Sequence, residues 1–297
     1  MPWLQIKLDV LPDNAEQYED LLLAAGCAAV TLQDLSDQPI FEPPLGTTPL
    51  WSNTELSGLF SADHDLEATT HFLHKSHRQL FPNKPFPTMK TEILEDKDWE
   101  REWMDNYHPM QFGERLWVCP SWKEAPNPNA VNLMLDPGLA FGTGTHPTTA
   151  LCLKFLDSLE LDGKQVVDYG CGSGILGIAA LLLGADHVTA VDIDPQALEA
   201  SVDNLARNKQ APETMTVCFP ENTPEIEADL VIANILAGPL VGLAPTLTKL
   251  TKTGGKIVLS GLLSRQEEEI RAAYGDAFEL DQVAESEGWI RINGIKK

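Results

Sequence analysis

The chain has 297 residues and a formal net charge of −23 at pH 7, from 21 Lys and Arg against 44 Asp and Glu. Its length indicates two domains, and its 43% hydrophobic content is typical of globular proteins. The acidic balance argues against a nucleic-acid surface, because phosphate binding requires clustered Lys and Arg. One explanation is a basic partner that is attracted by the electrostatic field of the protein. The alternative is that the negative charge only keeps the protein soluble.

The sequence predicts neither a membrane span nor a secretory signal. No apolar run approaches the roughly 20 residues of a spanning helix. The N-terminus, MPWLQIKLDV, lacks a basic segment followed by an apolar core. The five cysteines are scattered, odd in number and mostly within apolar runs, with no C-x-x-C pair. They are typical of reduced, buried thiols, so we expect a cytoplasmic protein.

Residues 1–95 predict a small α+β domain. Asp13 or Asn14 is expected to cap its first helix and Asp63 its second, and the proline-rich stretch Gln38–Pro49 is expected to be a loop. The order β-α-β-β-α-β is that of a ferredoxin-like fold. The predicted elements are strand Trp3–Val10, helix Ala15–Ala25, strand Ala28–Leu32, strand Glu55–Phe60, helix Leu66–Leu80 and strand Thr88–Leu94.

Three histidines on the second predicted helix, His71, His74 and His77, are spaced three residues apart. This spacing invites a metal site, but no further Cys or His lies nearby, so a solvated helix face is favoured and no metal is expected. The domain carries no catalytic cluster. Beside a cofactor domain, such a domain usually recognises a substrate.

Residues 96–129 form the predicted connection between the domains. Asp96–Asn106 is expected to be a short helix that Pro109 ends, with Trp99 and Trp103 on one face. Four tryptophans within this stretch favour packing at the domain junction over the alternative of lining a substrate entrance. Residues 130–297 remain as the cofactor domain.

The motif VVDYGCGSGI at Val166–Ile175 is the main functional signal. The β-branched apolar run predicts a buried strand, and the three alternate glycines that follow predict a turn. The apolar stretch Ile175–Leu183 predicts a helix. A strand, a glycine turn and a helix form a ligand site, because the helix offers unpaired N–H groups and the glycines expose backbone. The alternative is a turn that only allows the helix and the strand to pack closely.

The glycine spacing narrows the class of ligand. The dinucleotide motif G-x-G-x-x-G requires glycine where this chain has Ile175. Asp168, two residues before Gly170, would repel a pyrophosphate and suits a ligand that carries an ammonium group. The pattern D-x-G-x-G-x-G therefore resembles the cofactor turn of class I S-adenosylmethionine methyltransferases.

Alternating strands and helices continue to the C-terminus. Asp192 lies 22 residues past Gly170, where an acidic residue binds ribose hydroxyls in nucleotide folds, and Asp194 is expected to cap the next helix. Asn234 ends a central strand at the edge where ligands bind, and a turn is expected at Ile235–Pro239. We predict seven strands with helices on both faces, a doubly wound α/β domain. Beyond the glycine turn, strands are expected at His187–Val191, Met215–Phe219, Asp229–Ala233, Gly255–Ser260, Phe278–Ala284 and Trp289–Gly294, and helices at Pro195–Asn208 and Ser264–Tyr274.

The stretch LDPGLAFGTGTHPTT at Leu135–Thr149 predicts a glycine-rich loop that opens the helix Thr148–Leu159, with Thr145 as its cap. It lacks the G-K-[ST] ending of a nucleotide P-loop, which argues against ATP. Such a loop is suited to grip a carboxylate or to cover a bound ligand.

These motifs together identify a family. VVDYGCGSG, AVDIDP and ANILAGPL in this order, with LDPGLAFGTGTHPTT and the ferredoxin-like front domain, resemble the PrmA family over nearly the whole chain. Its members are Rossmann-like class I methyltransferases that act on ribosomal protein L-eleven of the large subunit. The resemblance implies that Gly170 lies under S-adenosylmethionine, Asp192 binds its ribose, Thr149 contacts its methionine end and Asp168 lies near its ammonium.

Asn234 is implied as the catalytic residue beside the transferring methyl, the alternative being a strand-end cap. The resemblance also implies lysine side chains, and as a further candidate the N-terminal amine, as methyl acceptors, with no direct contact to nucleic acid or membrane. We expect a monomer. The rival functions are a small-molecule methyltransferase, a nicotinamide oxidoreductase, which Ile175 argues against, and a scaffold that only binds a ribosomal protein.

Overall fold

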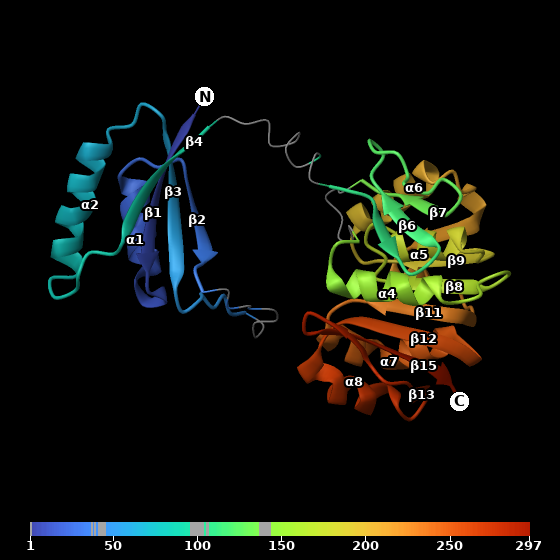
Figure 1. The fold of residues 1–297 in the computed structure, drawn as a ribbon. Helices are drawn as coiled ribbons and strands as arrows, with labels where there is room; N and C mark the ends of the chain where they lie inside the picture. Colours follow the sequence, from blue (N-terminus) through green and yellow to red (C-terminus); the bar gives the residue numbers. More distant parts are fainter. Residues whose placement is uncertain are drawn as a thin grey trace. The chain divides into compact units, whose positions relative to one another are not determined.

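The computed structural model describes residues 2–36, 38, 40, 46–95, 104, 107–136 and 144–297. It divides into two compact units, Met1–Met104 and Asp105–Lys297 (Figure 1), which we describe separately. Apart from Met104, the predicted helix Asp96–Asn106 lies outside the described residues, as does the centre of the predicted glycine-rich loop.

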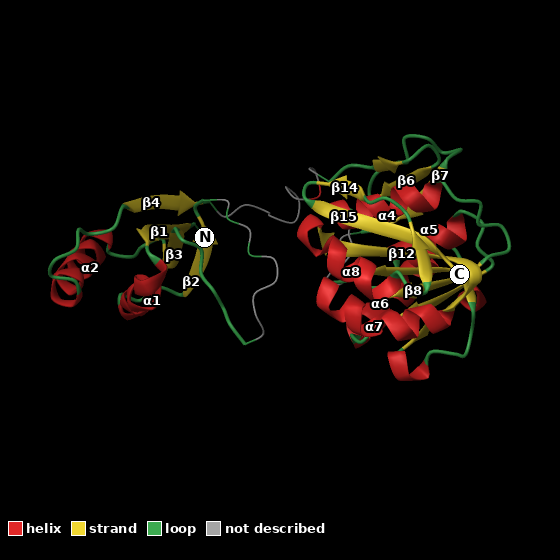
Figure 2. Ribbon diagram, turned by 90° about the horizontal axis from the view of Figure 1, so that it is seen from below, coloured by secondary structure: helices red, strands yellow, loops and turns green. Residues whose placement is uncertain are grey.

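The first unit has the predicted ferredoxin-like fold. Its four strands form an antiparallel sheet in the order β2-β3-β1-β4, and α1 and α2 cover one face of it (Figure 2). Alternate residues of β1, including Ile6 and Leu8, face these helices and pack with Leu22 and Leu73 in the core. The elements are β1 Trp3–Val10, α1 Ala15–Ala24, β2 Ala29–Asp34, β3 Thr54–Ser61, α2 Leu66–Leu80 and β4 Met89–Leu94.

Two helix-cap predictions in this unit are wrong. Asp65, not Asp63, caps α2: its Oδ1 accepts the N–H of Ala68 at 2.9 Å, because the cap residue must directly precede the first helical residue with an extended backbone. At α1 neither Asp13 nor Asn14 caps with its side chain, since a 3-10 turn at residues 12–14 leads into the helix.

The histidines of α2 do not form one solvated face, so that prediction is also wrong. His77 is 4% exposed. Its Nε2 donates to the carbonyl of Lys84 at 2.9 Å, which leaves Nδ1 to accept the hydroxyl proton of Tyr18 at 2.6 Å. His74 stacks on Phe86 with 3.8 Å between ring centroids. Within the described residues, no three His, Cys, Asp or Glu side chains are placed to hold a metal ion.

The second unit confirms the doubly wound α/β prediction, but among the described residues its main sheet has eight strands where seven were predicted. Its main sheet has the order β10-β9-β8-β11-β12-β15-β13, with β14 paired to β15. The first five strands are parallel, and β15 is antiparallel to both of its neighbours. The sheet strands are β8 Gln165–Tyr169, β9 His187–Val191, β10 Met215–Cys218, β11 Ala228–Asn234, β12 Thr251–Leu263, β13 Phe278–Leu280, β14 Ala284–Ser286 and β15 Trp289–Lys296.

Helices cover both faces of this sheet. Leu153 of α4, Ile178 of α5 and Leu205 of α6 pack on one face, and Leu247 of α7 and Ile270 of α8 on the other. Figure 2 shows the twisted sheet between α4 and α5 on one side and α7 and α8 on the other. The helices are α4 Pro147–Asp157, α5 Ile175–Leu182, α6 Pro195–Arg207, α7 Ala237–Leu250 and α8 Glu267–Tyr274.

A second, three-stranded sheet was not predicted. It consists of β5 Met110–Phe112, β6 Leu116–Cys119 and β7 Val131–Met134. Phe112 and Val118 share a core with Ile175 of α5. The structure therefore does not separate the later part of the predicted connector, residues 107–129, from the cofactor domain.

Other element boundaries also differ from the predictions. The predicted turn Ile235–Pro239 runs into a helix, since α7 begins at Ala237 and holds Pro239 in its first turn, where proline costs no hydrogen bond. The predicted strand Phe278–Ala284 is divided between β13 and β14. Within the described residues, no helix is both long and apolar enough to cross a membrane.

Candidate cofactor site

The glycine turn after β8 has the geometry that its sequence predicts. Gly170, Gly172 and Gly174 have φ values of +80°, +54° and +77°, in the left-handed region that glycine adopts without strain. The N–H groups of Gly170 and Cys171 both donate to the carbonyl of Val191, at 2.7 and 3.0 Å. The turn is thus tied to the end of β9, and α5 starts directly behind it.

Asp168, near the end of β8, is a buried carboxylate with one unpaired oxygen. The side chain is 1% exposed, and its Oδ2 accepts the N–H of Gly177 at 2.8 Å, in the first turn of α5. Oδ1 is also buried, and no described residue donates a hydrogen bond to it. A buried acceptor without a donor is costly unless a ligand supplies one.

The burial of Asp168 also affects its protonation. Desolvation raises the pKa of this carboxyl from 3.8 to about 7, the N–H of Gly177 lowers it, and the charge of Asp192 raises it further. A cation placed at Oδ1 would favour the ionised form and lower this pKa. The site is therefore electrostatically suited to a positively charged ligand group.

Asp192, at the end of β9, is oriented by backbone donors. Its Oδ2 accepts the N–H of Gly172 at 2.9 Å, and its Oδ1 accepts the N–H of Asp194 at 3.0 Å. Asp194 caps α6 as predicted, accepting the N–H of Gln196 at 2.9 Å. Each oxygen of Asp192 keeps a further lone pair for a ligand hydroxyl.

Asn234 and Thr149 meet although they are 85 residues apart in the chain. The Nδ2 of Asn234, the last residue of β11, donates to the Thr149 Oγ1 at 3.3 Å. Its Oδ1 is buried and, like that of Asp168, has no partner in the described part of the chain. Because Thr149 holds the amide nitrogen, the amide oxygen is left to accept a hydrogen bond from a ligand.

The helix that carries Thr149 is capped by His146, not by Thr145 as predicted. The Nδ1 of His146 accepts the N–H of Thr148 at 3.3 Å. The ring meets Trp289 edge-on, with 4.8 Å between centroids. Burial lowers the pKa of His146, and the charge of Glu287 opposes this.

The five predicted site residues lie at the carboxyl ends of β8, β9 and β11 and at the start of α4. Asp168 pairs across the sheet with Ile232, two residues before Asn234 on the neighbouring strand. Asp192 contacts the glycine turn that begins at Gly170. The predicted residues therefore gather at one edge of the main sheet, where parallel α/β sheets bind ligands.

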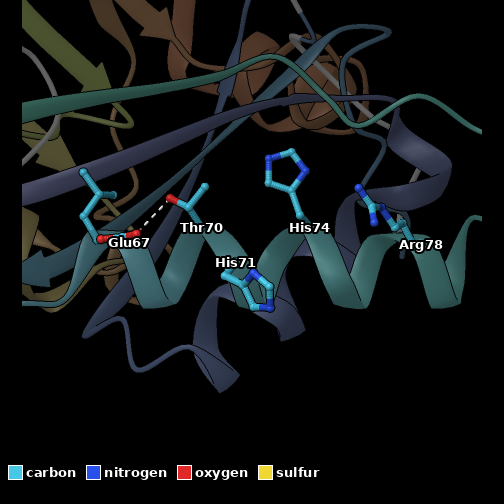
Figure 3. Close-up of a pocket in the computed structure, with 6 residues that line it drawn as sticks. Glu67, Thr70, His71, His74 and Arg78 are labelled. Carbon is cyan, nitrogen blue, oxygen red and sulfur yellow. Dashed lines mark hydrogen bonds between the residues drawn. The ribbon is translucent and has the colours of Figure 1, made fainter.

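Two residues that support the site were not predicted. His146 is one, and Gly177 is the other, because a Cβ at position 177 would lie 2.9 Å from Val188 Cγ1 and 3.3 Å from Asp168 Oδ2. A glycine inside an otherwise apolar helix was the available signal. The hollow along α2 that Figure 3 shows belongs to the first unit, and none of the site residues lines it. Its lining residues are Leu66, Glu67, Thr70, His71, His74 and Arg78.

The residues present fit S-adenosylmethionine better than a dinucleotide. Two buried acceptors without donors, Asp168 Oδ1 and Asn234 Oδ1, suit N–H donors of a ligand, and a buried carboxylate beside the turn disfavours a pyrophosphate. Asp192 offers acceptors for a ribose, and the glycines of the turn allow close approach to the backbone.

Comparison with known proteins agrees with this fit. A family model described as ribosomal protein L11 methyltransferase (PrmA) matches residues 2–297. The chain is 58% identical over 297 residues to the ribosomal protein L11 methyltransferase of Pseudomonas aeruginosa (strain LESB58), covering 100% of this chain and 99% of that protein. Identity to the corresponding Marinomonas sp. (strain MWYL1) protein is 55% over 296 residues, covering 100% and 99%.

A solved structure shows the same similarity. The crystal structure of ribosomal protein L11 methylase from Lactobacillus delbrueckii subsp. bulgaricus aligns with a TM-score of 0.58 and 31% identity, covering 64% of this chain and 100% of that one. The resemblance predicted from the motifs is confirmed, because the family model spans almost every residue. The chain belongs to the PrmA family of ribosomal protein L11 methyltransferases.

Proposed function

We propose that this chain transfers methyl groups from S-adenosylmethionine to amines of ribosomal protein L11, with Asn234 beside the reacting nitrogen. The observation that carries this proposal is the pair of buried oxygens, Asp168 Oδ1 and Asn234 Oδ1, that lack donors in the described structure. Membership of the PrmA family supports the choice of cofactor and substrate.

The cofactor, when bound, supplies a methyl group on a positively charged sulfur. In our proposal Asp168 Oδ1 accepts the N–H of its ammonium, and Asp192 accepts the hydroxyl groups of its ribose. Gly170 leaves room for close approach of the cofactor to the backbone. Thr149 holds the Asn234 amide through Nδ2, so that Oδ1 keeps a fixed direction.

The methyl acceptor must be a neutral amine, because a protonated nitrogen has no lone pair to donate. A lysine amine has a solution pKa of about 10.4, and both desolvation and a nearby positive charge lower it. Asn234 Oδ1 would accept a hydrogen bond from an N–H of the neutral amine. This bond would orient the lone pair of the amine nitrogen toward the methyl group. Alignment of the reactants and exclusion of water then account for most of the rate enhancement, and the transfer step needs no strong acid or base from the protein.

The protein substrate fits the charge of the chain. A net charge of −23 favours encounter with a basic protein such as a ribosomal protein. We propose that residues 1–95 recognise L11 and that residues 130–297 bind the cofactor. Residues 96–129 join the two, with the part from residue 107 packed as a portion of the second unit. We also propose a cytoplasmic location, where ribosomal proteins are assembled.

The test is incorporation of radiolabelled methyl groups into purified L11. Asn234→Ala should lower kcat about 100-fold, since it removes an interaction that aligns the reacting amine, while the Kd for S-adenosylmethionine changes less than about threefold. Asn222→Ala, which makes the same change on an exposed turn, is the matched control and should keep full activity.

Loss of affinity and kcat to the same extent in Asn234→Ala would contradict the assigned role. The rival functions predict other results in this assay or in direct binding measurements. Equal methylation of small amines indicates a small-molecule methyltransferase, tight binding of NADH indicates an oxidoreductase, and binding of L11 without incorporation indicates a scaffold.

A further inference from the structure

Two glycines approach Ile235, the residue that follows Asn234, more closely than any side chain would allow. A Cβ built on Gly170 would lie 2.3 Å from Ile235 Cγ2. A Cβ built on Gly261 would lie 2.2 Å from the carbonyl oxygen of Ile235 and 3.0 Å from its nitrogen. Separations this short force a shift of one partner, so both positions require glycine as long as Ile235 stays in place.

The backbone at both glycines is in the left-handed region, with φ of +80° at Gly170 and +86° at Gly261. Gly261 lies in β12 at a shift of the register between Ser260 and Leu262 against β15. Ser260 is the residue of β12 that pairs with Asn234. The irregularity in β12 thus falls directly after the residue beside Asn234, where the chain of Ile235 needs room.

We propose that Gly261 is a positioning residue for methyl transfer. Together with Gly170 it forms a glycine clamp, defined as Gly170 and Gly261 on either side of Ile235, which fixes the backbone behind Asn234. This inference rests on the role proposed above for Asn234. Gly261 acts through that residue and contacts neither the cofactor nor the substrate.

The contact that the clamp protects is sensitive to small movements. The bond from Asn234 Nδ2 to Thr149 Oγ1 is 3.3 Å long, close to the limit of a hydrogen bond. A methyl group at position 261 must push the Ile235 carbonyl away, and Asn234 moves with it. A displacement of a few tenths of an ångström would break the bond and release the amide oxygen from its fixed direction.

The two sides of the clamp touch different atoms of Ile235, so Ile235→Ala distinguishes them. Gly170 meets the side chain through Cγ2, which this truncation removes. Gly261 meets the backbone carbonyl, which no substitution of Ile235 removes. Gly254→Ala is the matched control, because Gly254 lies in the same strand with φ of +76° and has nothing within 4 Å of its Cβ position.

The experiment measures kcat for methylation of L11 at saturating S-adenosylmethionine, with each variant corrected for its folded fraction. Gly261→Ala should lower kcat about 100-fold, with KM for the cofactor within about threefold of the parent, and Gly254→Ala should lower kcat less than about threefold. In the Ile235→Ala background, Gly261→Ala should still lower kcat about 100-fold, because the backbone carbonyl of Ile235 is unchanged.

The proposal is overturned if Gly254→Ala loses as much turnover as Gly261→Ala, or if Ile235→Ala rescues Gly261→Ala. A crystal structure of Gly261→Ala gives a readout without catalysis: the Asn234 to Thr149 separation should exceed about 3.5 Å. If Gly261→Ala displaces the Asn234 amide without lowering kcat, the role of Asn234 is refuted. If the Asn234 amide is not displaced, the clamp is refuted.

Discussion

Two buried titratable side chains, His77 in the first unit and Asp168 in the second, show opposite solutions to the cost of burying a polar group. Both ring nitrogens of His77 have partners, in Tyr18 and the carbonyl of Lys84. Asp168 has a donor for only one of its oxygens. A fully satisfied buried group stabilises the fold, whereas a half-satisfied one keeps capacity for a ligand at the expense of stability. Burial alone therefore does not mark a site, and the missing partner does.

Substitution of Asp168 should give the largest effect. Asp168→Asn should weaken binding of S-adenosylmethionine about 100-fold, because removing one partner of a buried ion pair costs about 3 kcal/mol or more. The same variant should raise the free energy of unfolding of the unliganded protein by about 2 kcal/mol at pH 8, because the buried charge is gone. Calorimetric titration and urea unfolding measure the two quantities. Weaker binding together with lower stability would mean that Asp168 is only structural.

Substitution of His77 should give the converse result. His77→Ala should lower the free energy of unfolding by about 2–4 kcal/mol, since it leaves a cavity and two buried groups without partners. Affinity for S-adenosylmethionine should not change. Tyr18→Phe removes a single partner and serves as the graded control, with a loss of about 1 kcal/mol. A change in cofactor affinity in either variant would break the distinction between the two groups.

The pH dependence of stability and of cofactor affinity should reveal the titration of Asp168. In the folded, unliganded protein the pKa of Asp168 is raised to about 7, so between about pH 4 and pH 7 the native state holds a proton that the unfolded state has lost. This contribution to stability is present at acid pH and is lost as the pH rises through about 7. Binding of an ammonium needs the ionised carboxylate, so affinity should fall as the pH drops from 7 to 5, by up to about tenfold per unit.

The matched comparison is Asp168→Asn over the same pH range. His146, whose pKa burial lowers, titrates in both proteins, so the difference between the two profiles isolates Asp168. Above about pH 8 the α-amino group of the cofactor loses its own proton, and affinity should fall again. Identical profiles for the parent and the variant would show that Asp168 does not bind the ammonium.

The sequence predicted those parts of the fold and site that depend on local signals. The bounds of β9 and of α2, and the Asp194 cap of α6, follow from short-range periodicity and capping chemistry. Of the proposed site residues, Asp168 lies near the end of a buried strand, Asn234 ends one and Asp192 follows one. Parallel strands bring these carboxyl ends together without further information.

The features that were missed depend on distant partners. The strands β5 and β6 have three and four residues and are held mainly by pairing across the small sheet. His146 displaces Thr145 as the cap of α4 where Trp289, far along the chain, supports its ring. The approach of Gly261 to Ile235 depends on the register of β12 against β15, which no local pattern encodes. The start of α7 was predicted as a turn that ended at Pro239, which lies in the first turn of this helix.

The unpaired oxygen of Asp168 is, in our proposal, the binding point of the cofactor's ammonium. A crystal structure with S-adenosylhomocysteine, which keeps that ammonium, tests it most directly. The ligand nitrogen should lie about 2.7–3.0 Å from Asp168 Oδ1, with the ribose hydroxyls at Asp192. Ligand density that leaves this oxygen unpaired, or that lies away from the glycine turn, would contradict it.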